Sequence, residues 1–426
     1  MNSLLRIPYA VAGSLAHALV RVVPRGTSKF QRGLNARRGI VERYERWAAT
    51  SRDPTRPLVW VHAPSVGEGL QAQPVIELMR TRRPDVQIAY TFYSPSAESL
   101  SQSLKVDFAD YLPFDTFADA DAIIAALRPS AIVFSKLDIW PALTEQAAVA
   151  RVPVGVISAT LAESSGRRGL FARALLTDAY RVIERVGAID EEDADHFRQM
   201  GVRAERIEVT GDTRYDQVWK RARRAPSALV ESMRSSRPTL VAGSTWPADE
   251  EHLFSAWRNV RDKIPDARLV IAPHELTAAH LVSVERSARR RKLSLARMGA
   301  DDAANADVVL VDRYGILGDL YALADVAYVG GGFHSAGLHS VLEPAAFGAP
   351  VLFGPRHDKS RDARKLIEAA GGAAVTGVAD LSLRLNDWLG SLPARDVAGE
   401  AARSMVQAGT GAGERSFGLV SALLGR

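Results

Sequence analysis

The feature that most constrains the fold is the alternation, from residue 57 onward, of short apolar runs with longer helical patterns. Segments such as GLQAQPVIELMRTRR and ADADAIIAALR carry apolar residues at three- and four-residue spacing, which predicts helices. The runs between them are continuously apolar, as in strands of a parallel sheet covered on both faces. The expected strands of this first series are LVWVHA (58–63), VQIAYTF (86–92), YLPF (111–114), AIVFS (131–135), VPVGVISA (152–159), RVGAID (185–190) and RIEVTG (206–211).

A second series of the same kind follows a charged stretch without a strand pattern, DTRYDQVWKRARRAPSALVESMRSSRP. Its expected strands are TLVAGS (239–244), ARLVIAP (267–273), DVVLVD (307–312), VAYVGG (326–331), PVLFG (350–354) and a weak AAVTG (373–377). Because 426 residues exceed what one hydrophobic core usually holds, we predict an α/β protein of two doubly wound, Rossmann-like domains. The expected division is an N-terminal segment 1–38, a first domain 39–215, a connection 216–236, and a second domain 237–426 whose last helix can cross back.

The composition excludes several kinds of site. The chain has no cysteine, which rules out disulfides, a thiolate nucleophile and zinc–sulfur ligation, and fits a reducing, cytoplasmic setting. The net charge of +5 is modest, and its basic cluster lacks the interleaved aromatic residues of a nucleic-acid-binding surface.

The N-terminal segment combines an apolar run with a basic one. Residues 7–23 are mostly apolar, but His17 and Arg21 interrupt them, and a membrane-spanning helix needs about 20 apolar residues. A short anchor, an amphipathic helix in the membrane interface and a packed helix all remain open. The basic residues that follow suit the anionic cytoplasmic leaflet of an inner membrane, and the alternative is a solvated linker. They are Arg21, Arg25, Lys29, Arg32, Arg37 and Arg38.

The stretch WVHAPSVGEG places a carboxylate, Glu68, on a turn after the first expected strand. Ligands of open α/β sheets bind outside the carboxyl ends of the strands, so this side chain is expected at the edge of the sheet that faces a ligand. Two interpretations are equally compatible with the spacing. Glu68 either caps the following helix or acts as a general base toward a substrate hydroxyl.

The second domain offers two further loops. In AGSTWPADEE, Ser244 and Thr245 lie between a strand and a helix, where hydroxyls and backbone amides can receive a phosphate or simply cap the helix. In YVGGGFHSAGLHSVLEPAAFGAPVLFGP, the glycines 330–332 follow a strand and Glu343 lies on the next helix. Glycines admit a bulky ligand and a carboxylate can accept both hydroxyls of a ribose, which favours a nucleotide-sugar site over plain tight turns. His334 and His339 lack a third ligand at a suitable spacing, so no metal is expected.

Taken together and in order, HAPSVGEG, TFYSPSAES, IWPAL, GDTRYD, AGSTWPADEE, IAPHE and GLHSVLEPAAFGAPVLFGP resemble the Kdo transferases, which attach 3-deoxy-D-manno-oct-2-ulosonic acid (Kdo) to lipid A. The resemblance runs from about residue 30 to about residue 380. It implies a GT-B fold, a CMP-Kdo donor, a lipid A precursor as acceptor, inversion at the ketosidic carbon, and neither metal nor cofactor. It also implies attachment to the cytoplasmic face of the inner membrane through the N-terminus.

The resemblance assigns roles to particular residues. Glu68 matches the family's general base. The first domain would hold the acceptor. The loop residues expected to contact the sugar or the acceptor are Ser65, Gly67, Ser94, Ser96 and Asp138. The second domain would bind the donor nucleotide-sugar through Ser244, Thr245, His274, Gly331, Gly332, His339, Ser340 and Glu343.

The chain departs from the family's usual motifs at several positions. Where many members read ELWPN, this chain has Asp138 in place of a glutamate and Ala142 in place of the asparagine, and Lys136 replaces a farther glutamate. Ser340 stands where an asparagine would contact the nucleotide. An expected arginine is missing at Ala272-Pro273, and Thr160 replaces another.

Two other functions compete with this interpretation. A GT-B enzyme that uses another nucleotide-sugar, either a UDP-sugar transferase or an epimerase, would carry similar loops in its second domain. A catalytically silent scaffold at the membrane is favoured only by the departures, and the retention of Glu68 and Glu343 argues against it.

Overall fold

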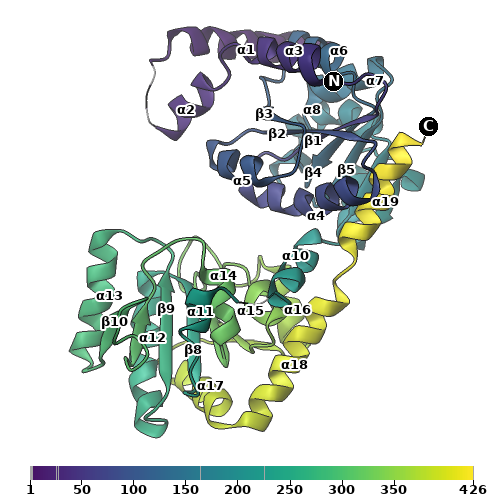
Figure 1. Ribbon diagram of the computed structural model, residues 1–426. Helices are drawn as coiled ribbons and strands as arrows, with labels where there is room; N and C mark the ends of the chain where they lie inside the picture. Colours follow the sequence, from purple (N-terminus) through teal and green to yellow (C-terminus); the bar gives the residue numbers. More distant parts are fainter. Residues whose placement is uncertain (1–2, 25, 27, 164, 225, 426) are drawn as a thin grey trace. The chain divides into compact units, whose positions relative to one another are not determined.

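The protein is described from a computed structural model that covers residues 3–24, 26, 28–163, 165–224 and 226–425, so Arg25 of the basic cluster lies outside the described residues. The chain forms two compact units (Figure 1). One comprises the residues up to Gln217 together with those from Thr410 on, and the other comprises Val218–Gly409. Within the charged stretch between the two sheets lie the helices α10 (Thr213–Ala222) and α11 (Ala228–Glu231).

The first unit is built on a sheet of seven strands in the order β3-β2-β1-β4-β5-β6-β7, and every neighbouring pair is parallel. Its strands are β1 (Leu58–His62), β2 (Gln87–Phe92), β3 (Phe108–Tyr111), β4 (Ala131–Ser135), β5 (Val154–Ala159), β6 (Arg185–Ala188) and β7 (Ile207–Val209).

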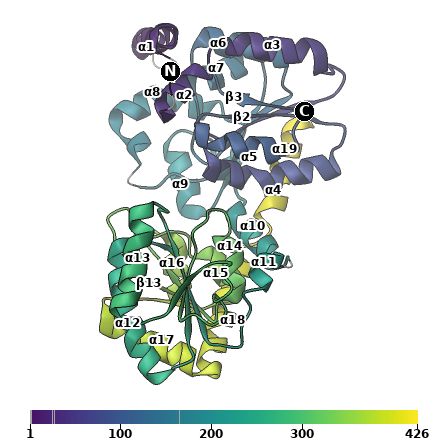
Figure 2. The same ribbon diagram turned by 60° about the vertical axis from the view of Figure 1, so that its left-hand side comes forward.

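Helices cover both faces of this sheet (Figure 2), which is why its inner strands are buried at every position. On one face lie α4 (Val66–Arg82) and α19 (Ala412–Leu424), which contact each other and the strands. The other face carries helices that contact one another in chain order: α3 (Ile40–Ser51), α6 (Phe117–Leu127), α7 (Pro141–Val149) and α8 (Leu170–Arg181). The remaining elements are α5 (Glu98–Ser103), α9 (Glu191–Gln199) and the short turns η1 (Pro95–Ala97), η2 (Gly166–Arg168) and η3 (Ala204–Arg206).

The second unit has the same plan, with the strand order β10-β11-β9-β8-β12-β13-β14 and parallel pairing throughout. Its strands are β8 (Thr239–Thr245), β9 (Arg268–Pro273), β10 (Leu295–Arg297), β11 (Val308–Leu310), β12 (Val326–Val329), β13 (Val351–Phe353) and β14 (Gly372–Ala374). Its further helices are α12 (Pro247–Lys263), α13 (Ala278–Arg290), α14 (Leu317–Leu320), η4 (Tyr321–Leu323), α15 (Leu342–Ala346), α16 (Arg361–Glu368), α17 (Val378–Gly390) and α18 (Leu392–Ala408).

Successive side chains of these strands enter two different cores. Leu240 and Ala242 pack in the cluster under α12 and α17, whereas Val241, between them, packs in the cluster of the opposite face. In β9, Leu269 likewise packs in the cluster under α12 and α17, and Val270 packs in the cluster of the opposite face. Since side chains alternate across a strand, a sheet buried on both faces needs the continuous apolar runs seen in the sequence.

Two strands differ from the sequence-based expectation. The strand expected at 111–114 lies at Phe108–Tyr111, because Phe108 pairs with Ala89 of β2 and Pro113 has no N–H to extend the ladder. β10 was not predicted at all, since its three residues, Leu295–Arg297, form only a short edge strand beside β11.

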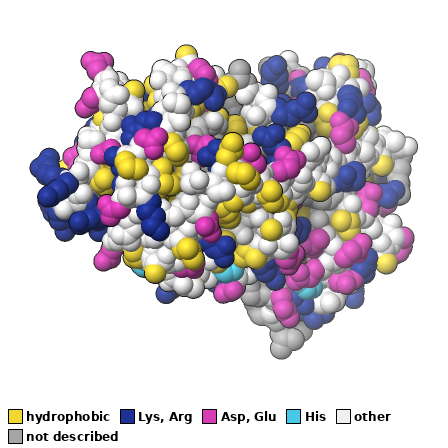
Figure 3. All heavy atoms as spheres, turned by 90° about the horizontal axis from the view of Figure 1, so that it is seen from below, with side chains coloured by type: hydrophobic (Ala, Val, Ile, Leu, Met, Phe, Trp, Pro, Cys, Tyr) yellow, Lys and Arg dark blue, Asp and Glu magenta, His cyan; other side chains and the backbone are white. Residues whose placement is uncertain are grey.

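The basic run ERSARRRK (285–292) lies at the end of α13. Leu281, Val284 and Ala288 of α13 are buried, while its arginines Arg286, Arg289 and Arg290 are exposed. Lys and Arg side chains gather at the left edge of the face shown in Figure 3, the side on which Figure 1 draws α13.

At the N-terminus, α1 (Ser3–Val22) and α2 (Lys29–Asn35) pack on the first unit. The Tyr9 hydroxyl donates to Asp115 Oδ2 at 2.5 Å, and His17 Nε2 lies 2.7 Å from Asp119 Oδ2. Arg38 donates to carbonyl oxygens at the end of α1. Arg37 is buried and donates to three backbone carbonyls, so it is a structural residue. Among the described residues, no helix has both the length and the apolar character that crossing a bilayer requires.

We predict that α19 is an integral part of the first core. Leu423 is buried against that core, and its Cδ1 would lie 2.6 Å from a Cβ added at Gly155. Replacing Leu423 with Ala should lower the free energy of unfolding by about 2–5 kcal/mol through lost burial and the cavity left behind. The control Val149→Ala removes a 78% exposed side chain and should change it by less than about 0.5 kcal/mol. Equal effects of the two variants in urea unfolding would contradict this packing.

Candidate functional site

The order of the strands identifies one switch point in each sheet. In the first sheet β1 and β4 are neighbours, and the chain leaves them toward opposite sides. In the second sheet β8 and β12 take the same places. Loops at the carboxyl ends of such neighbouring strands leave a crevice in open α/β sheets, which is where their ligands bind.

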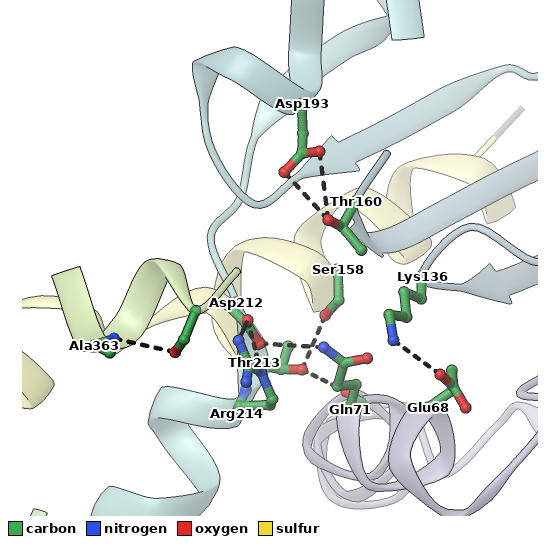
Figure 4. A network of polar contacts seen from close by, with 11 residues as sticks. Glu68, Gln71, Lys136, Ser158, Thr160, Asp193, Asp212, Thr213, Arg214 and Ala363 are labelled. Atoms are coloured by element: carbon green, nitrogen blue, oxygen red, sulfur yellow. Dashed lines mark hydrogen bonds and ion pairs between the residues drawn. The ribbon is translucent and has the colours of Figure 1, made fainter. Parts of the chain in front are cut away.

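Glu68 lies in the first turn of α4, directly after β1, and is held from three sides (Figure 4). Its Oε1 lies 3.0 Å from Nζ of Lys136, a residue of the loop after β4. Its Oε2 accepts a hydrogen bond from the hydroxyl of Ser65, the N-cap residue of α4, and its backbone carbonyl accepts from Ser135 Oγ at 2.9 Å. The carboxylate also accepts a hydrogen bond from the Glu68 backbone amide in the first turn of α4, and its role as a general base stays a prediction.

Burial alone would raise the pKa of Glu68, but the hydrogen bond from Ser65 and the charge of Lys136 outweigh it and hold the pKa below the usual glutamate value. Glu68 is therefore ionised at neutral pH. An ionised, oriented carboxylate can accept a proton from a hydroxyl that is placed beside it.

The neighbouring loops are joined to this one through backbone contacts. The amides of Tyr93 and Ser94 both donate to the carbonyl of Pro64, so the loop after β2 lies against the Glu68 loop. Ser94 Oγ and Ser96 Oγ are 2.9 Å apart, and Ser94 caps the short turn η1. Gly67 lies within the first turn of α4, beside Ser65.

Asp138 belongs to a second group, formed by residues of β1 and of the loops after β4 and β5. Its Oδ1 accepts from Arg167 at 2.7 Å. Although His62 Nε2 lies 3.8 Å from Asp138, that nitrogen already accepts a hydrogen bond from Trp140 Nε1 at 3.1 Å. Burial lowers the pKa of His62, so the ring is neutral with its proton on Nδ1, which faces Thr91. The contact between His62 and Asp138 is therefore no ion pair.

A buried network behind Glu68 fixes the position of α4 (Figure 4). Gln71 of α4 donates to Asp212 of the GDTR motif, and its carbonyl accepts from Thr213 Oγ1 at 2.7 Å. Thr213 also contacts Ser158 at 2.9 Å, while Asp212 accepts from Arg214 at 2.6 Å. The GDTR motif thus anchors the helix that carries Glu68.

In the second unit, the loops after β8, β9 and β12 meet around Trp246. The indole stacks on His274 with ring centroids 4.7 Å apart and on His334 at 4.2 Å. Trp246 Nε1 donates to His339 Nε2 at 3.2 Å. Burial lowers the pKa of His339, and the neighbouring His274 adds to this effect, so His339 is neutral with its proton on Nδ1. Trp246 was not predicted as a site residue, although it lies inside the AGSTWPADEE motif.

Asp249 organises the glycine loop. Its buried carboxylate accepts from the backbone amides of Gly331 at 2.8 Å and Phe333 at 3.2 Å, and from the Tyr328 hydroxyl at 3.0 Å. The glycines are sterically required here, because a Cβ at Gly331 would come within 2.1 Å of a backbone oxygen. A Cβ at Gly332 would likewise come within 2.4 Å of a backbone nitrogen. The glycine loop therefore packs directly against neighbouring backbone at Gly337 and Gly354.

The two hydroxyl residues after β8 differ in their surroundings. Thr245 is buried, and its hydroxyl donates to Glu250 Oε1 at 2.9 Å. Both oxygens of Glu250 lie 3.0 Å from His280 Nε2, so His280 helps to fix the carboxylate that accepts from Thr245. Ser244 adopts a left-handed backbone conformation, with φ of 53°. A non-glycine residue in this region of φ is uncommon and is frequent at ligand sites.

Glu343 lies in the first turn of α15 and is paired with Arg221 Nη1 at 3.0 Å. Burial raises the pKa of Glu343, although the charge of Arg221 acts in the opposite direction. Arg221 comes from the charged stretch that the sequence offered only as a connection. Ser340 is exposed, and the structure records no hydrogen bond of its side chain.

The candidate residues therefore form two groups, each described within its own unit. The first contains Glu68, Ser65, Gly67, Ser94 and Ser96, with Asp138 beside them. The second contains Ser244, Thr245, His274, Gly331, Gly332 and His339, with Glu343 held by Arg221. Among the described residues, no group of three or more His, Asp or Glu side chains is arranged to hold a metal ion.

Two parallel α/β units with loop sites at their switch points define a protein of the GT-B class. Residues 35–217 match the family model described as 3-deoxy-D-manno-octulosonic-acid transferase (kdotransferase). The first unit of the chain is therefore similar to the 3-deoxy-D-manno-octulosonic acid transferases over the residues that this family model covers.

Relatives from three bacteria extend the similarity over most of the chain. The 3-deoxy-D-manno-octulosonic acid transferase of Haemophilus influenzae is 26% identical over 92% of each chain. That of Bordetella pertussis is 29% identical over 90% of this chain and 91% of its own. The Aquifex aeolicus protein is 26% identical over 78% of this chain and 86% of its own.

Solved structures of low identity support the fold. The UDP-GlcNAc 2-epimerase from Neisseria meningitidis, bound to UDP-GlcNAc, has a TM-score of 0.64 at 13% identity and covers 86% of this chain and 100% of its own. A putative UDP-N-acetylglucosamine 2-epimerase from Listeria monocytogenes has a TM-score of 0.62 at 15% identity, over 86% of this chain and 96% of its own. At these identities the likeness concerns the fold alone.

We predict that Asp249 is essential for the glycine loop. The variant Asp249→Ala leaves the buried amide of Gly331 without a partner, and each unpartnered buried polar group costs about 1–3 kcal/mol. Calorimetry should show the second unit melting at a lower temperature than in the parent protein. The control Asp262→Ala removes an exposed carboxylate of the same helix and should leave the melting temperature unchanged. Unchanged melting of Asp249→Ala would contradict this role.

Proposed function

We propose that the protein is a glycosyltransferase that moves Kdo from CMP-Kdo to a hydroxyl of a lipid A precursor, with inversion and without a metal. The observation that carries the proposal is Glu68, an ionised carboxylate at the switch point of the unit that matches the Kdo transferase family model. The match of residues 35–217 to the family model and the similarity to named Kdo transferases over 78% to 92% of the chain support the sugar and the reaction class.

The proposed reaction is a single displacement. The acceptor oxygen attacks the ketosidic C2 atom of the sugar, the bond from C2 to the phosphate oxygen breaks, and its electron pair leaves with CMP. Glu68 takes the proton of the attacking hydroxyl. Attack from the side opposite the leaving group inverts the configuration at C2. A positioned general base contributes about 10²- to 10⁴-fold to such a step.

The second unit is proposed to hold the donor. The amides of Gly331 and Phe333 already donate to Asp249, so the leaving phosphate is proposed to meet the Ser244 loop at the start of α12, where the helix N-terminus favours an anion. Trp246 with its stacked imidazoles offers a flat surface for the cytosine ring. Glu343 would accept the ribose hydroxyls, so nucleotide binding has to share or replace its contact with Arg221.

The acceptor is proposed to reach the first unit from the cytoplasmic surface of the inner membrane. One face of α1 is anchored to the unit through Tyr9 and His17. A stripe of large apolar side chains on α1 is between 48% and 74% exposed, and its spacing of three or four residues places it on one face of the helix. The stripe consists of Ile7, Val11, Leu15, Leu19 and Val22. Such an amphipathic helix lies in the interface rather than across the bilayer.

The role of Glu68 is tested by Glu68→Gln, which keeps the shape of the side chain but cannot accept the proton. We expect turnover to fall by about 10²- to 10⁴-fold, with the melting temperature nearly unchanged. Glu77→Gln on the same helix serves as the matched control and should retain activity. Because the pKa of Glu68 is lowered, the base form should persist, and the rate should fall only below the usual glutamate range. A fully active Glu68→Gln enzyme would remove the assignment.

The membrane surface is tested by sedimentation with vesicles that contain anionic lipid. The triple variant with Val11, Leu15 and Leu19 replaced by Ser should lose most of its vesicle binding, because each side chain gives up its apolar contact with the interface. Val149→Ser, at a more exposed apolar site on α7, is the control and should bind like the parent protein. Equal binding of both variants would argue against the α1 stripe as the contact.

The donor and acceptor are tested together by CMP release. The purified protein should release CMP from CMP-Kdo rapidly when a lipid A precursor is present and slowly when it is absent. Release that does not depend on the lipid, or turnover of a UDP-sugar in its place, would favour another GT-B activity. Absence of any turnover would favour a silent scaffold.

A further inference from the structure

The loop after β4 places a lysine beside Glu68. Lys136 follows the last residue of β4, and β4 is the direct neighbour of β1, the strand that precedes the Glu68 loop. The distance from Lys136 Nζ to Glu68 Oε1 is 3.0 Å, and Ser135 Oγ donates to the Glu68 carbonyl at 2.9 Å. Figure 4 shows the two side chains pointing toward each other. The ammonium is thereby fixed next to the proposed base.

The backbone at Lys136 is unusual for a residue with a long side chain. Its φ is 72°, in the left-handed region that favours glycine, and its amide donates to Ile157 O at 2.9 Å. Backbone conformations of this kind cost free energy and cluster at functional sites. A lysine at a position suited to glycine indicates that the side chain has a use there.

The ammonium has capacity beyond its contact with Glu68. An ammonium group carries three N–H donors, and in the described part of the chain Glu68 is the one recorded polar partner of the Lys136 side chain. The side chain of Lys136 is 37% exposed, compared with 16% for Glu68. One N–H of the Lys136 ammonium therefore donates to Glu68, and the other two can donate to a solute.

Arg167, the cation beside Asp138, is already engaged. Arg167 donates to Asp138 at 2.7 Å and to the carbonyl of Ile139 at 3.2 Å. His62 is neutral, because its buried ring accepts from Trp140. An anionic group that approaches Glu68 can therefore bind to Lys136, whose ammonium has further N–H donors.

The chemistry of the sugar supplies such an anion. A 2-ulosonic acid carries its carboxylate on C1, one bond from C2, which is the carbon attacked in the proposed reaction. A hydroxyl that transfers its proton to Glu68 while it attacks C2 brings this carboxylate close to the carboxylate of Glu68. Two like charges at such a distance repel each other, and a cation shared between them turns the repulsion into attraction.

We propose that Lys136 is a specificity-determining residue that binds the C1 carboxylate of the donor sugar while Glu68 holds it in place. The inference rests on the proposed function and deepens it. Lys136 selects sugar acids over neutral sugars and lets two carboxylates occupy one site.

The test compares two inhibitors of Kdo transfer from CMP-Kdo: free Kdo, and its C1 amide, which lacks the negative charge. The parent protein should bind Kdo more tightly than the amide by about 10- to 100-fold, the range of a charge-assisted hydrogen bond. Lys136→Met should lose or reverse this preference, because Glu68 then repels the carboxylate of Kdo and not the neutral amide. Lys136→Arg, which keeps the cation, and Lys105→Met, which removes an exposed lysine of the same unit, should both retain the preference.

A second measurement separates sugar binding from support of the base. Because Lys136 lowers the pKa of Glu68, Lys136→Met should also move the acidic limb of kcat/KM to higher pH. A shifted limb with the preference for Kdo intact would show that Lys136 only holds Glu68, and would overturn the proposal. No preference in the parent protein would overturn it as well. Failure of the parent protein to transfer Kdo at all would instead refute the proposed function.

Discussion

The structure depends on one constraint, which is that each parallel sheet is buried on both faces. Helices cover the faces, so only the ends of the strands are available for chemistry. The neighbours β1 and β4 bring Glu68 and Lys136 together, although 67 intervening residues separate them in the chain. The neighbours β8 and β12 do the same for the Ser244 loop and the glycine loop. The position of both candidate sites thus follows from strand order.

The two units share a further device, in which a tryptophan fixes a histidine. Trp140 donates to His62 in the first unit and Trp246 donates to His339 in the second. In both pairs burial lowers the pKa of the histidine, so the ring stays neutral and carries its proton on Nδ1. Charge at the two sites is therefore carried by carboxylates, lysine and arginine, whose partners the structure identifies.

The alternation in the sequence predicted the fold, because short continuous apolar runs between helical patterns are typical of parallel strands covered on both faces. It was not sufficient at the sheet edges, where β10 is too short to give a pattern and Pro113 obscured the end of β3. The position of Glu68 after β1 could also be predicted, since a carboxylate on a small-residue turn is visible in a short stretch.

The partners of the site residues could not be predicted, because they join distant segments. Lys136 was visible only as a departure from the family motif, and its contact with Glu68 requires β4 to lie beside β1. Arg221 looked like part of a charged linker, yet it pairs with Glu343. Asp249 looked like an ordinary acidic residue in the first turn of a helix, and its four hydrogen bonds depend on the fold of the glycine loop.

Mass analysis of a lipid A precursor, after incubation with the purified protein and CMP-Kdo, tests the central claim most directly. The account predicts that the lipid gains the mass of one or more Kdo residues and that the gain disappears when CMP-Kdo is omitted. A lipid of unchanged mass, with the protein shown to be folded and the donor shown to be intact, would contradict it.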